Sequence, residues 1–292
     1  MSGGSAPGPP PEGHRPPDPA PTGSAPASSL SLASGKLIRD EPRDGVTRLR
    51  IANAERRGAL DHEILDALAE TVASLDARCL VITGSEGMFS AGYDLGNLDG
   101  QEFRERAERL VAHPFHEALK VLAGYRFPVV GALNGHAIGG GLELALTCDI
   151  RIAARGIKLA MPPAKLGLIY SHTGLRKFLE LCGPAHTAEL FYVGRNIDAD
   201  RGERIGLVSH VVEPENLEQG ALCMAAEIAA NAPLSVAGNK QVLGTLRAYD
   251  GALPEDVEQR MVALRESCFE TEDLREGVRA FAEKRAPEWK GR

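Results

Sequence analysis

The stretch from Pro128 to Ile150, PVVGALNGHAIGGGLELALTCDI, constrains the fold of this chain more than any other. Its apolar first residues predict a buried strand, and proline is tolerated at a strand's first position. The three glycines at 139–141 have no Cβ atoms, so their backbone N–H groups can approach a ligand closely. A helix that begins near Leu142 would leave its first amides unpaired at the same place. The stretch therefore predicts a turn that binds an anion or an oxyanion.

Glu143 lies two residues beyond the last glycine and places an acidic group beside these amides. The glycine spacing matches neither G-x-G-x-x-G nor G-x-x-x-x-G-K-[ST], and no lysine follows, which argues against a nucleotide-phosphate site. The plain alternative is a tight strand-to-helix turn beside a solvated glutamate.

A second loop of the same kind precedes this stretch. The apolar run CLVIT, residues 79–83, predicts an interior strand, and GSEGMFSAGYDL, residues 84–95, is the loop that leaves it. The backbone N–H of Tyr93 follows the small residues Ser90, Ala91 and Gly92, so it can be aimed at a ligand. Two loops that each offer one backbone donor are what a two-amide oxyanion hole requires.

The composition of the chain limits the partners that it can be expected to bind and the cellular compartment in which it is expected. With a net charge of -7, a pI near 5.7 and no basic cluster, the chain lacks the signature of nucleic-acid or anionic-membrane binding. Its five cysteines are scattered without metal-ligand spacing, which predicts free thiols, no metal site and a cytoplasmic location. No apolar run approaches the roughly 18 residues of a membrane span.

The first 35 residues differ from all that follow. They hold nine of the 19 prolines and almost no large apolar side chains. Such a segment cannot bury enough surface to offset its ordering entropy, so residues 1–35 are predicted to be a disordered tail. They contain neither the apolar core of a secretory signal nor the repeated arginines of a transit peptide.

The two loops also carry a resemblance to a known family. MFSAGYDL and ALNGHAIGGGLELALTCDIRIAA resemble the signature loops of the crotonase superfamily, the enoyl-CoA hydratase and isomerase family. The similarity extends to RRGALDHEIL, with Gly58 where the common pattern has Asn, and to TEDLREGVRAFAEKR, and so spans roughly residues 37–291. It implies an α/β fold, a spiral of ββα units in two roughly perpendicular sheets surrounded by helices. Residues 36–232 would form the crotonase core and 233–292 a C-terminal helical trimerisation region.

The resemblance also implies a site. The amides of Tyr93 and Gly140 would hold the thioester oxygen of an acyl-CoA, with Glu143 beside them. Coenzyme A would be part of the substrate, and no separate cofactor would be bound. The protein would assemble as a homotrimer or hexamer. Residues placed at the substrate or its CoA moiety are Arg57, Ala59, Ala91, Asp94, Leu95, His136, Gly139, Pro163 and His172, with Phe281 and Lys284 reaching a neighbour's CoA.

One position departs from the hydratases of this family. They pair the glutamate that matches Glu143 with a second one in a P-E-x-x-L-G stretch, and in MPPAKLGLIYSHTG that position is Pro163. Proline cannot transfer a proton, so hydration by two glutamates is not expected. A lone Glu143 could serve double-bond isomerisation or a weaker hydration.

The segment 161–175 resembles another branch, methylmalonyl-CoA decarboxylase, which also lacks the second glutamate and carries a tyrosine where this chain has Tyr170. Loss of CO2 from a 2-carboxyacyl thioester needs an oriented carboxylate and an oxyanion hole but no general base. An uncharged residue at 163 would avoid repelling that carboxylate. Decarboxylation is therefore the reaction that the sequence favours, with Tyr170 as a catalytic residue. The alternative for Tyr170 is a core aromatic whose hydroxyl is satisfied.

Three function classes stay open at this point. The first is an acyl-CoA enzyme, with decarboxylase, hydratase and isomerase as its internal alternatives. The second is a non-catalytic acyl-CoA-binding or RNA-binding homologue, against which Glu143 and the acidic balance argue. The third is a nucleotide-dependent enzyme, which the glycine spacing disfavours.

Overall fold

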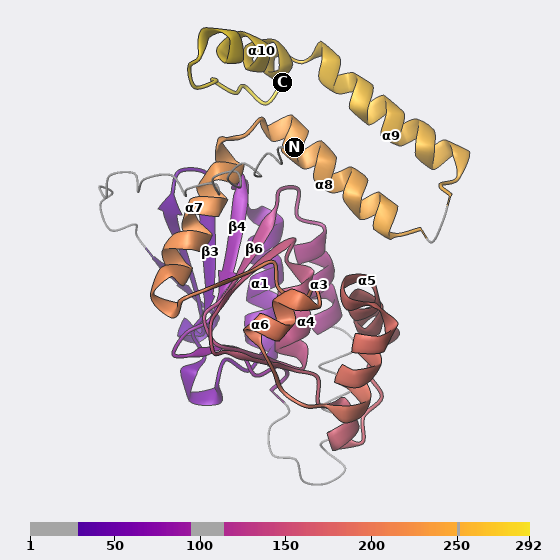
Figure 1. The fold of residues 1–292 in the computed structure, drawn as a ribbon. Coiled ribbons are helices and arrows are strands. Elements are labelled where there is room, and N and C mark those ends of the chain that lie inside the picture. The colour runs from indigo at the N-terminus through magenta and orange to yellow at the C-terminus, as the bar shows by residue number, and fades with distance from the viewer. Residues whose placement is uncertain (1–28, 95–113, 250–251) are drawn as a thin grey trace, which may run out of the picture.

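The computed structural model describes residues 29–94, 114–249 and 252–292, which fold into two sheets surrounded by helices (Figure 1). Within these residues the larger sheet has the strand order β1-β2-β3-β4-β6-β8-β11 and the smaller one the order β10-β9-β7-β5. The strands are β1 (Leu30–Leu32), β2 (Leu37–Arg43), β3 (Val46–Ile51), β4 (Cys79–Thr83), β5 (Met88–Ser90), β6 (Val129–Leu133), β7 (His136–Ile138), β8 (Ile150–Ala154), β9 (Lys158–Ala160), β10 (Ile197–Asp198) and β11 (His210–Val212). The predicted α/β class is confirmed.

The helices cover both sheets and form the C-terminal end of the chain (Figure 1). They are α1 (His62–Ser74), α3 (His116–Ala123), α4 (Gly140–Thr147), α5 (His172–Ala188), α6 (Ala199–Arg204), α7 (Leu217–Ala230), α8 (Pro233–Arg247), α9 (Glu255–Ser267) and α10 (Glu272–Glu283). Short helical turns lie at η1 (Ala33–Gly35), η2 (Ala54–Arg56), η4 (Pro163–Leu166), η5 (Glu189–Val193), η6 (Pro214–Asn216) and η7 (Cys268–Glu270).

The parallel centre of the larger sheet explains the continuous apolar runs of the sequence. Strands β3, β4, β6, β8 and β11 run parallel, while β1, β2 and β3 pair antiparallel at one edge. Parallel strands are covered on both faces, so both sets of side chains must be apolar. All five residues of β6 are buried, as are the first four of β4.

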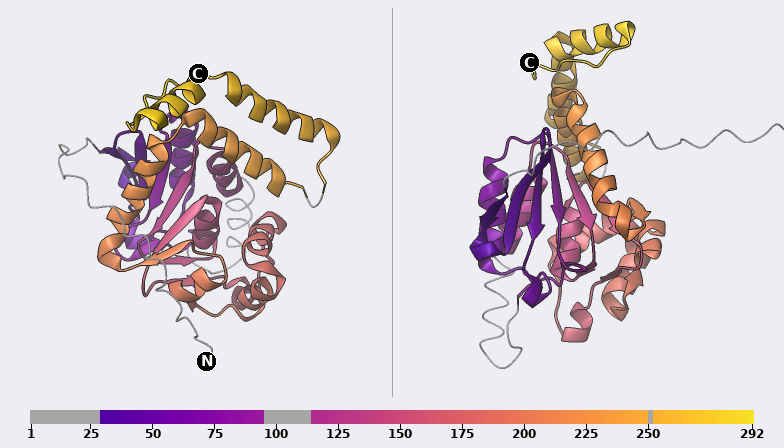
Figure 2. Two further views of the ribbon diagram at one scale, coloured as in Figure 1. Left: turned by 45° about the horizontal axis from the view of Figure 1, so that its top comes forward. Right: turned by 90° about the vertical axis from the view of Figure 1, so that its left-hand side faces the viewer.

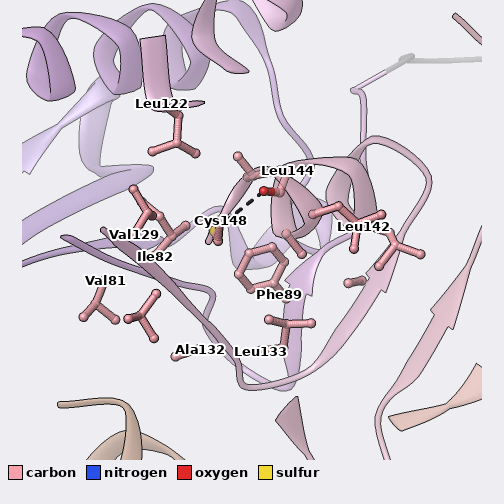
Figure 3. Close-up of a cluster of buried hydrophobic side chains, with 14 of the residues drawn as sticks. Val81, Ile82, Phe89, Leu122, Val129, Ala132, Leu133, Leu142, Leu144 and Cys148 are labelled. Atoms are coloured by element: carbon pink, nitrogen blue, oxygen red, sulfur yellow. Dashed lines mark hydrogen bonds between the residues drawn. The ribbon is translucent and has the colours of Figure 1, made fainter. Parts of the chain in front are cut away.

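The core lies between this sheet and helices α1, α3 and α4 (Figure 3). Phe89, Leu133 and Leu142 are fully buried there, next to the side chains of β4 and β6. Residues 140–146 of α4 are all buried, which is the behaviour of a helix that is apolar on every side. The strand–turn–helix segment predicted at 128–150 is therefore the centre of the molecule.

Two helices, α1 and α10, begin at a side chain that caps them. The side chain of Asp61 accepts a hydrogen bond from the N–H of Ile64 at 2.9 Å, and that of Thr271 accepts one from Leu274 at 3.1 Å. Each oxygen satisfies an amide that the first helical turn leaves unpaired.

The predicted end of the tail at residue 35 is placed too late. Strand β1 pairs antiparallel with β2, with Leu30 opposite Arg39, and η1 connects the two strands. A three-residue edge strand needs only one neighbour, so it can form in a segment too poor in apolar residues to build a core. Residues 1–28 lie outside the described part of the chain.

The C-terminal helices α8, α9 and α10 extend away from the sheets, as Figure 2 shows. Polar contacts that join them to the body include the ion pairs of Lys240 with Asp149 at 2.8 Å and of Arg247 with Glu180 at 3.0 Å, and the indole N–H of Trp289 donates to the carbonyl of Ala230 at 2.6 Å. Their predicted role in trimerisation stays a prediction. In the described ranges no single helix is long and apolar enough to cross a membrane. The length and hydropathy of a membrane span are met only when two consecutive helical segments, Pro214–Ala230 and Pro233–Arg247, are counted together, and these are bent by 107° relative to each other.

Candidate active site

Two glycine-rich loops meet at the start of α4. Gly139 is in a positive-φ conformation, and its N–H donates to the carbonyl of Ala160 at 2.9 Å, so this amide holds the turn in place. A Cβ on Gly141 would lie 2.3 Å from the carbonyl oxygen of Ser90, and one on Gly92 would lie 2.9 Å from the amide nitrogen of Gly140. Real Cβ atoms do not approach backbone this closely, so both positions need glycine. We call residues 90–93 and 139–141 the glycine corner.

Ser90 fixes the second loop against the first. Its side chain is fully buried, and its hydroxyl donates to the carbonyl of Gly58 at 2.7 Å and accepts from the N–H of Gly92 at 3.1 Å. A buried hydroxyl with both roles filled contributes rigidity rather than reactivity.

The two amides that the sequence singled out lie in this corner. Within the described residues, the N–H groups of Tyr93 and Gly140 donate to no protein acceptor, although Gly140 is buried. The ring of Tyr93 covers Gly140, whose Cβ would lie 3.0 Å from the ring. The corner therefore offers two backbone donors, as a two-amide oxyanion hole requires.

Glu143 is buried one turn into α4, with 3% of its surface exposed. Its Oε2 accepts a hydrogen bond from the Tyr170 hydroxyl at 2.6 Å, and its Oε1 lies 3.4 Å from Lys177 Nζ. Lys177 Nζ also donates to Thr147 Oγ1 at 2.7 Å. We call Glu143, Thr147, Tyr170 and Lys177 the Glu143 network. The alternative of a solvated glutamate is wrong.

Tyr170 reaches Glu143 because Gly174 leaves room for it. A Cβ on Gly174 would lie 2.5 Å from the Tyr170 ring and 3.0 Å from Glu143 Oε2. The ring packs edge to face on Phe191, with the centroids 5.5 Å apart. Because Tyr170 gives its one proton to Glu143, the hydroxyl of Tyr93, 3.4 Å away, must be the donor in a long contact with Tyr170.

Burial sets the protonation of this network. It raises the pKa of Tyr170 well above its usual range, and the neighbouring charge of Glu143 raises it further. The same two causes raise the pKa of Tyr93. Burial lowers the pKa of Lys177, while the attraction of Glu143 opposes that effect. At neutral pH the two phenols are therefore protonated donors.

Four predicted CoA-side residues lie beside the glycine corner. Arg57 is exposed, Ala59 is buried, and the N–H of Ala91 donates to the carbonyl of Arg57 at 3.1 Å. Asp94 forms an ion pair with Arg56 at 2.7 Å. The structure thus brings Arg57, Ala59, Ala91 and Asp94 together, and the fifth, Leu95, falls outside the described residues.

Three other predicted residues take different positions. His136 accepts a hydrogen bond at Nδ1 from the N–H of Lys158 at 3.1 Å. Burial lowers the pKa of His136, and the charges of Lys158 and Arg57 lower it further. At neutral pH the ring is therefore neutral and carries its proton on Nε2. Pro163 is buried at the first position of η4. His172 is exposed at the first position of α5. Ser171, before it, caps α5 by accepting from the N–H of Gly174 at 3.1 Å.

Phe281 and Lys284 lie on α10, far from α4 within one chain (Figure 1). Phe281 is 88% exposed, and Lys284 ends the helix in a left-handed conformation. Their predicted contact with a neighbour's CoA stays a prediction. No group of acidic, histidine and cysteine side chains with metal-binding geometry occurs in the part of the chain that the structure describes.

Sequence reasoning did not find Lys177, Thr147 or Gly174. Thr147 lies on α4 itself, four residues after Glu143, so helical spacing alone could have indicated it. For Lys177 and Gly174 the available signal was the buried face of α5, on which Gly174 and Phe178 repeat at helical spacing with Lys177 between them. That signal does not say which helix the face contacts. Only the packing of α5 on α4 shows that these residues meet Glu143.

A buried carboxylate beside two free backbone amides on this fold defines a crotonase-type protein. The family model described as enoyl-CoA hydratase/isomerase matches residues 41–292, and the chain therefore belongs to that family. It is 35% identical over 246 residues to a "probable enoyl-CoA hydratase, mitochondrial" of Dictyostelium discoideum, covering 84% of this chain and 85% of the relative. It is 33% identical over 247 residues to the crotonyl-CoA hydratase of Syntrophomonas wolfei, covering 82% and 90%.

A solved enoyl-CoA hydratase of Bacillus anthracis has the same fold. The TM-score is 0.78 at 28% sequence identity, and the match covers 88% of this chain and 100% of that one. The crotonase fold is thus confirmed, with its two sheets and C-terminal helices. The local resemblance to methylmalonyl-CoA decarboxylase finds no specific support among these relatives, whose names are those of hydratases.

Proposed function

We propose that this protein hydrates or isomerises an enoyl-CoA thioester, with Glu143 as the one side chain that moves the proton. The observation that carries the proposal is the buried Glu143 carboxylate beside the free amides of Tyr93 and Gly140. The relatives named hydratases support an enoyl-CoA substrate, and the one named crotonyl-CoA hydratase favours a short acyl chain. This reverses the order that the sequence favoured, in which decarboxylation came first.

The chemistry follows from the two parts of the site. Two amides that polarise the thioester carbonyl stabilise the enolate oxygen that forms during the reaction, and removing one such donor typically costs about 3 to 4 kcal/mol. In hydration, water adds its oxygen to the β carbon, Glu143 takes the released proton, and the same carboxyl returns a proton to the α carbon. In isomerisation, Glu143 takes a proton from the α carbon and returns it to the γ carbon. Both reactions are balanced with a single carboxylate.

Tyr170 assists Glu143 in this proposal. Its hydroxyl donates to Oε2 at 2.6 Å, which leaves the other lone pairs of the carboxylate available to accept the substrate's proton. Its raised pKa keeps the phenol protonated throughout the working pH range. The tyrosine therefore orients the base and does not compete with it.

Decarboxylation of a 2-carboxyacyl-CoA is the second candidate, because Pro163 replaces a carboxylate that would repel the substrate's own. A panel of crotonyl-CoA, a 3-enoyl-CoA and methylmalonyl-CoA, assayed with the same wild-type preparation, separates the candidates. We expect turnover of one or both enoyl thioesters. Release of CO2 from methylmalonyl-CoA, with neither enoyl thioester turned over, would contradict the proposal.

We also propose that the chain assembles into a homotrimer or hexamer through its C-terminal helices. Large apolar side chains are exposed there: Leu243 and Leu246 on α8, and Val278 and Phe281 on α10. A patch of this kind on an extended arm is typical of a protein interface. Light scattering should give a mass of three or six chains, and a monomer at micromolar concentration would contradict assembly.

A further inference from the structure

Lys177 is the only lysine or arginine that the described residues place in an ion pair with Glu143. It lies on α5 three residues after Gly174, so the two positions share the face that packs against α4. Its side chain is 22% exposed. A lysine is rarely buried to this extent unless something pairs with it.

Thr147 holds the ammonium group in place. Lys177 Nζ donates to Thr147 Oγ1 at 2.7 Å, shorter than its 3.4 Å separation from Glu143 Oε1. The Thr147 hydroxyl in turn donates to the backbone carbonyl of Glu143 at 2.9 Å. One turn of α4 therefore carries both the Glu143 carboxylate and Thr147, which holds the ammonium group of Lys177. Lys177 cannot move without breaking this short hydrogen bond.

Among the residues that the structure describes, Lys177 is the one cation paired with Glu143. From the loop after β5 the carboxylate faces Tyr93, and from the start of α5 it faces Tyr170, both neutral donors. Around Lys177 itself lie Cys148 and Arg247, and only the second carries a charge at neutral pH. Without Lys177, the Glu143 carboxylate, which is 3% exposed, would be buried away from water with no cation beside it, which is costly for a charged group.

We propose that Lys177, anchored by Thr147, is a positioning residue that pairs with the Glu143 carboxylate and holds it directed at the Tyr170 hydroxyl. It acts through Glu143 and contacts no substrate. This inference rests on the proposed function, in which Glu143 must begin the reaction as a base.

The kinetic test uses Lys177→Met, with Lys120→Met as the matched control because Lys120 is 71% exposed on α3. Removing the ammonium group takes away the cation that pairs with the carboxylate, so Glu143 should lose its fixed orientation. With crotonyl-CoA or a 3-enoyl-CoA, whichever is turned over, kcat at neutral pH should fall about tenfold or more while KM stays within about threefold. Lys177→Arg should restore most of the rate. Thr147→Val should lower it partly, and Thr147→Ser should not.

A second readout needs no activity. The chain has five tyrosines, so 13Cζ-labelled tyrosine gives a simple NMR spectrum, in which Tyr170→Phe assigns the Tyr170 signal. That signal should move in Lys177→Met and keep its place in Lys120→Met. A Tyr170 signal unchanged in Lys177→Met, or a kcat at the wild-type value in that variant, would overturn the inference. If the wild type turns over no enoyl thioester, the proposed function fails, and the NMR shift alone then decides whether Lys177 positions Glu143.

Discussion

The glycine corner lies at the start of α4 and the Glu143 network extends from Glu143 to Thr147, the last residue of the same helix, yet the two are built by different means. The glycine corner is made of backbone, and its geometry requires residues that have no Cβ atom. A Cβ on Gly141 would lie 2.3 Å from the carbonyl oxygen of Ser90. The Glu143 network is made of side chains from two helices and the loop before α5, joined by contacts of 2.6 to 3.4 Å.

This difference predicts that substitutions in the two regions lower the activity in different ways. A steric requirement set by backbone cannot be met by small adjustments, because both loops are held by buried hydrogen bonds such as that of Ser90. A network of flexible side chains loses one contact at a time and should fail by degrees. Substitutions in the two regions should therefore differ in size as well as in kind.

The largest effect is expected in the glycine corner. Gly141→Ala forces the loop carrying Ser90 away from α4 and moves the amides of Tyr93 and Gly140 apart, so kcat should fall by at least about 100-fold. The matched control is Gly220→Ala, because nothing lies within 4 Å of a Cβ there and Gly220 is inside α7. That change should leave the rate unaltered and stabilise the helix by roughly 0.5 to 1 kcal/mol.

Cys148, which ends α4, reports whether the Gly141 variant is still folded. Burial raises the pKa of its thiol to about 12, so the native protein should resist alkylation at this position while exposed Cys223 reacts. Peptide mapping after alkylation separates the two. A Gly141→Ala protein with protected Cys148 and wild-type kcat would show that the corner tolerates a methyl group and would break the comparison.

A smaller effect is expected at the residues of the Glu143 network that support the Glu143 carboxylate. Tyr170→Phe removes one hydrogen bond to a buried carboxylate, so kcat should fall about tenfold, or roughly 1.4 kcal/mol, with little change in KM. Tyr192→Phe is the control, because Tyr192 is 80% exposed. Equal rates for the two variants would mean that the hydroxyl of Tyr170 does not support Glu143.

The smallest effect is expected away from both regions, at the N-terminal end. Removing residues 1–28 should leave the melting temperature unchanged, since their composition offers little apolar surface to bury. Removing residues 1–35 also deletes β1 and its pairing with β2, which should cost about 1 kcal/mol, or roughly 2 to 4 °C in Tm. Calorimetry of the two truncations would sharpen the boundary, and an equal Tm for both would show that β1 contributes nothing.

The glycine corner could be predicted from the sequence because its signals are local. Glycines without side chains, apolar runs and capping residues act within a few positions, so the strand, the turn and α4 were all placed correctly. Strand β1 was missed because its three residues, LSL, are too short a run to stand out beside a proline-rich segment.

The Glu143 network could be predicted only in part. Glu143 was found from its spacing after the glycines and Tyr170 through resemblance, and the sequence does not state that their side chains touch. Lys177 was missed because its partner Glu143 lies 34 residues earlier, on another helix. Contacts between helices depend on how the whole chain packs, and no pattern within α5 indicates which residue of α4 faces it.

The most direct test of the account is deuterium incorporation from D2O by the wild type and Glu143→Gln, with crotonyl-CoA as substrate. The account predicts that the wild type forms 3-hydroxybutyryl-CoA with deuterium at the α carbon. Glu143→Gln should do so at least about 100-fold more slowly and bind crotonyl-CoA with a Kd within about threefold of wild type. A Glu143→Gln protein that incorporates deuterium at the wild-type rate would contradict the claim that Glu143 moves the proton.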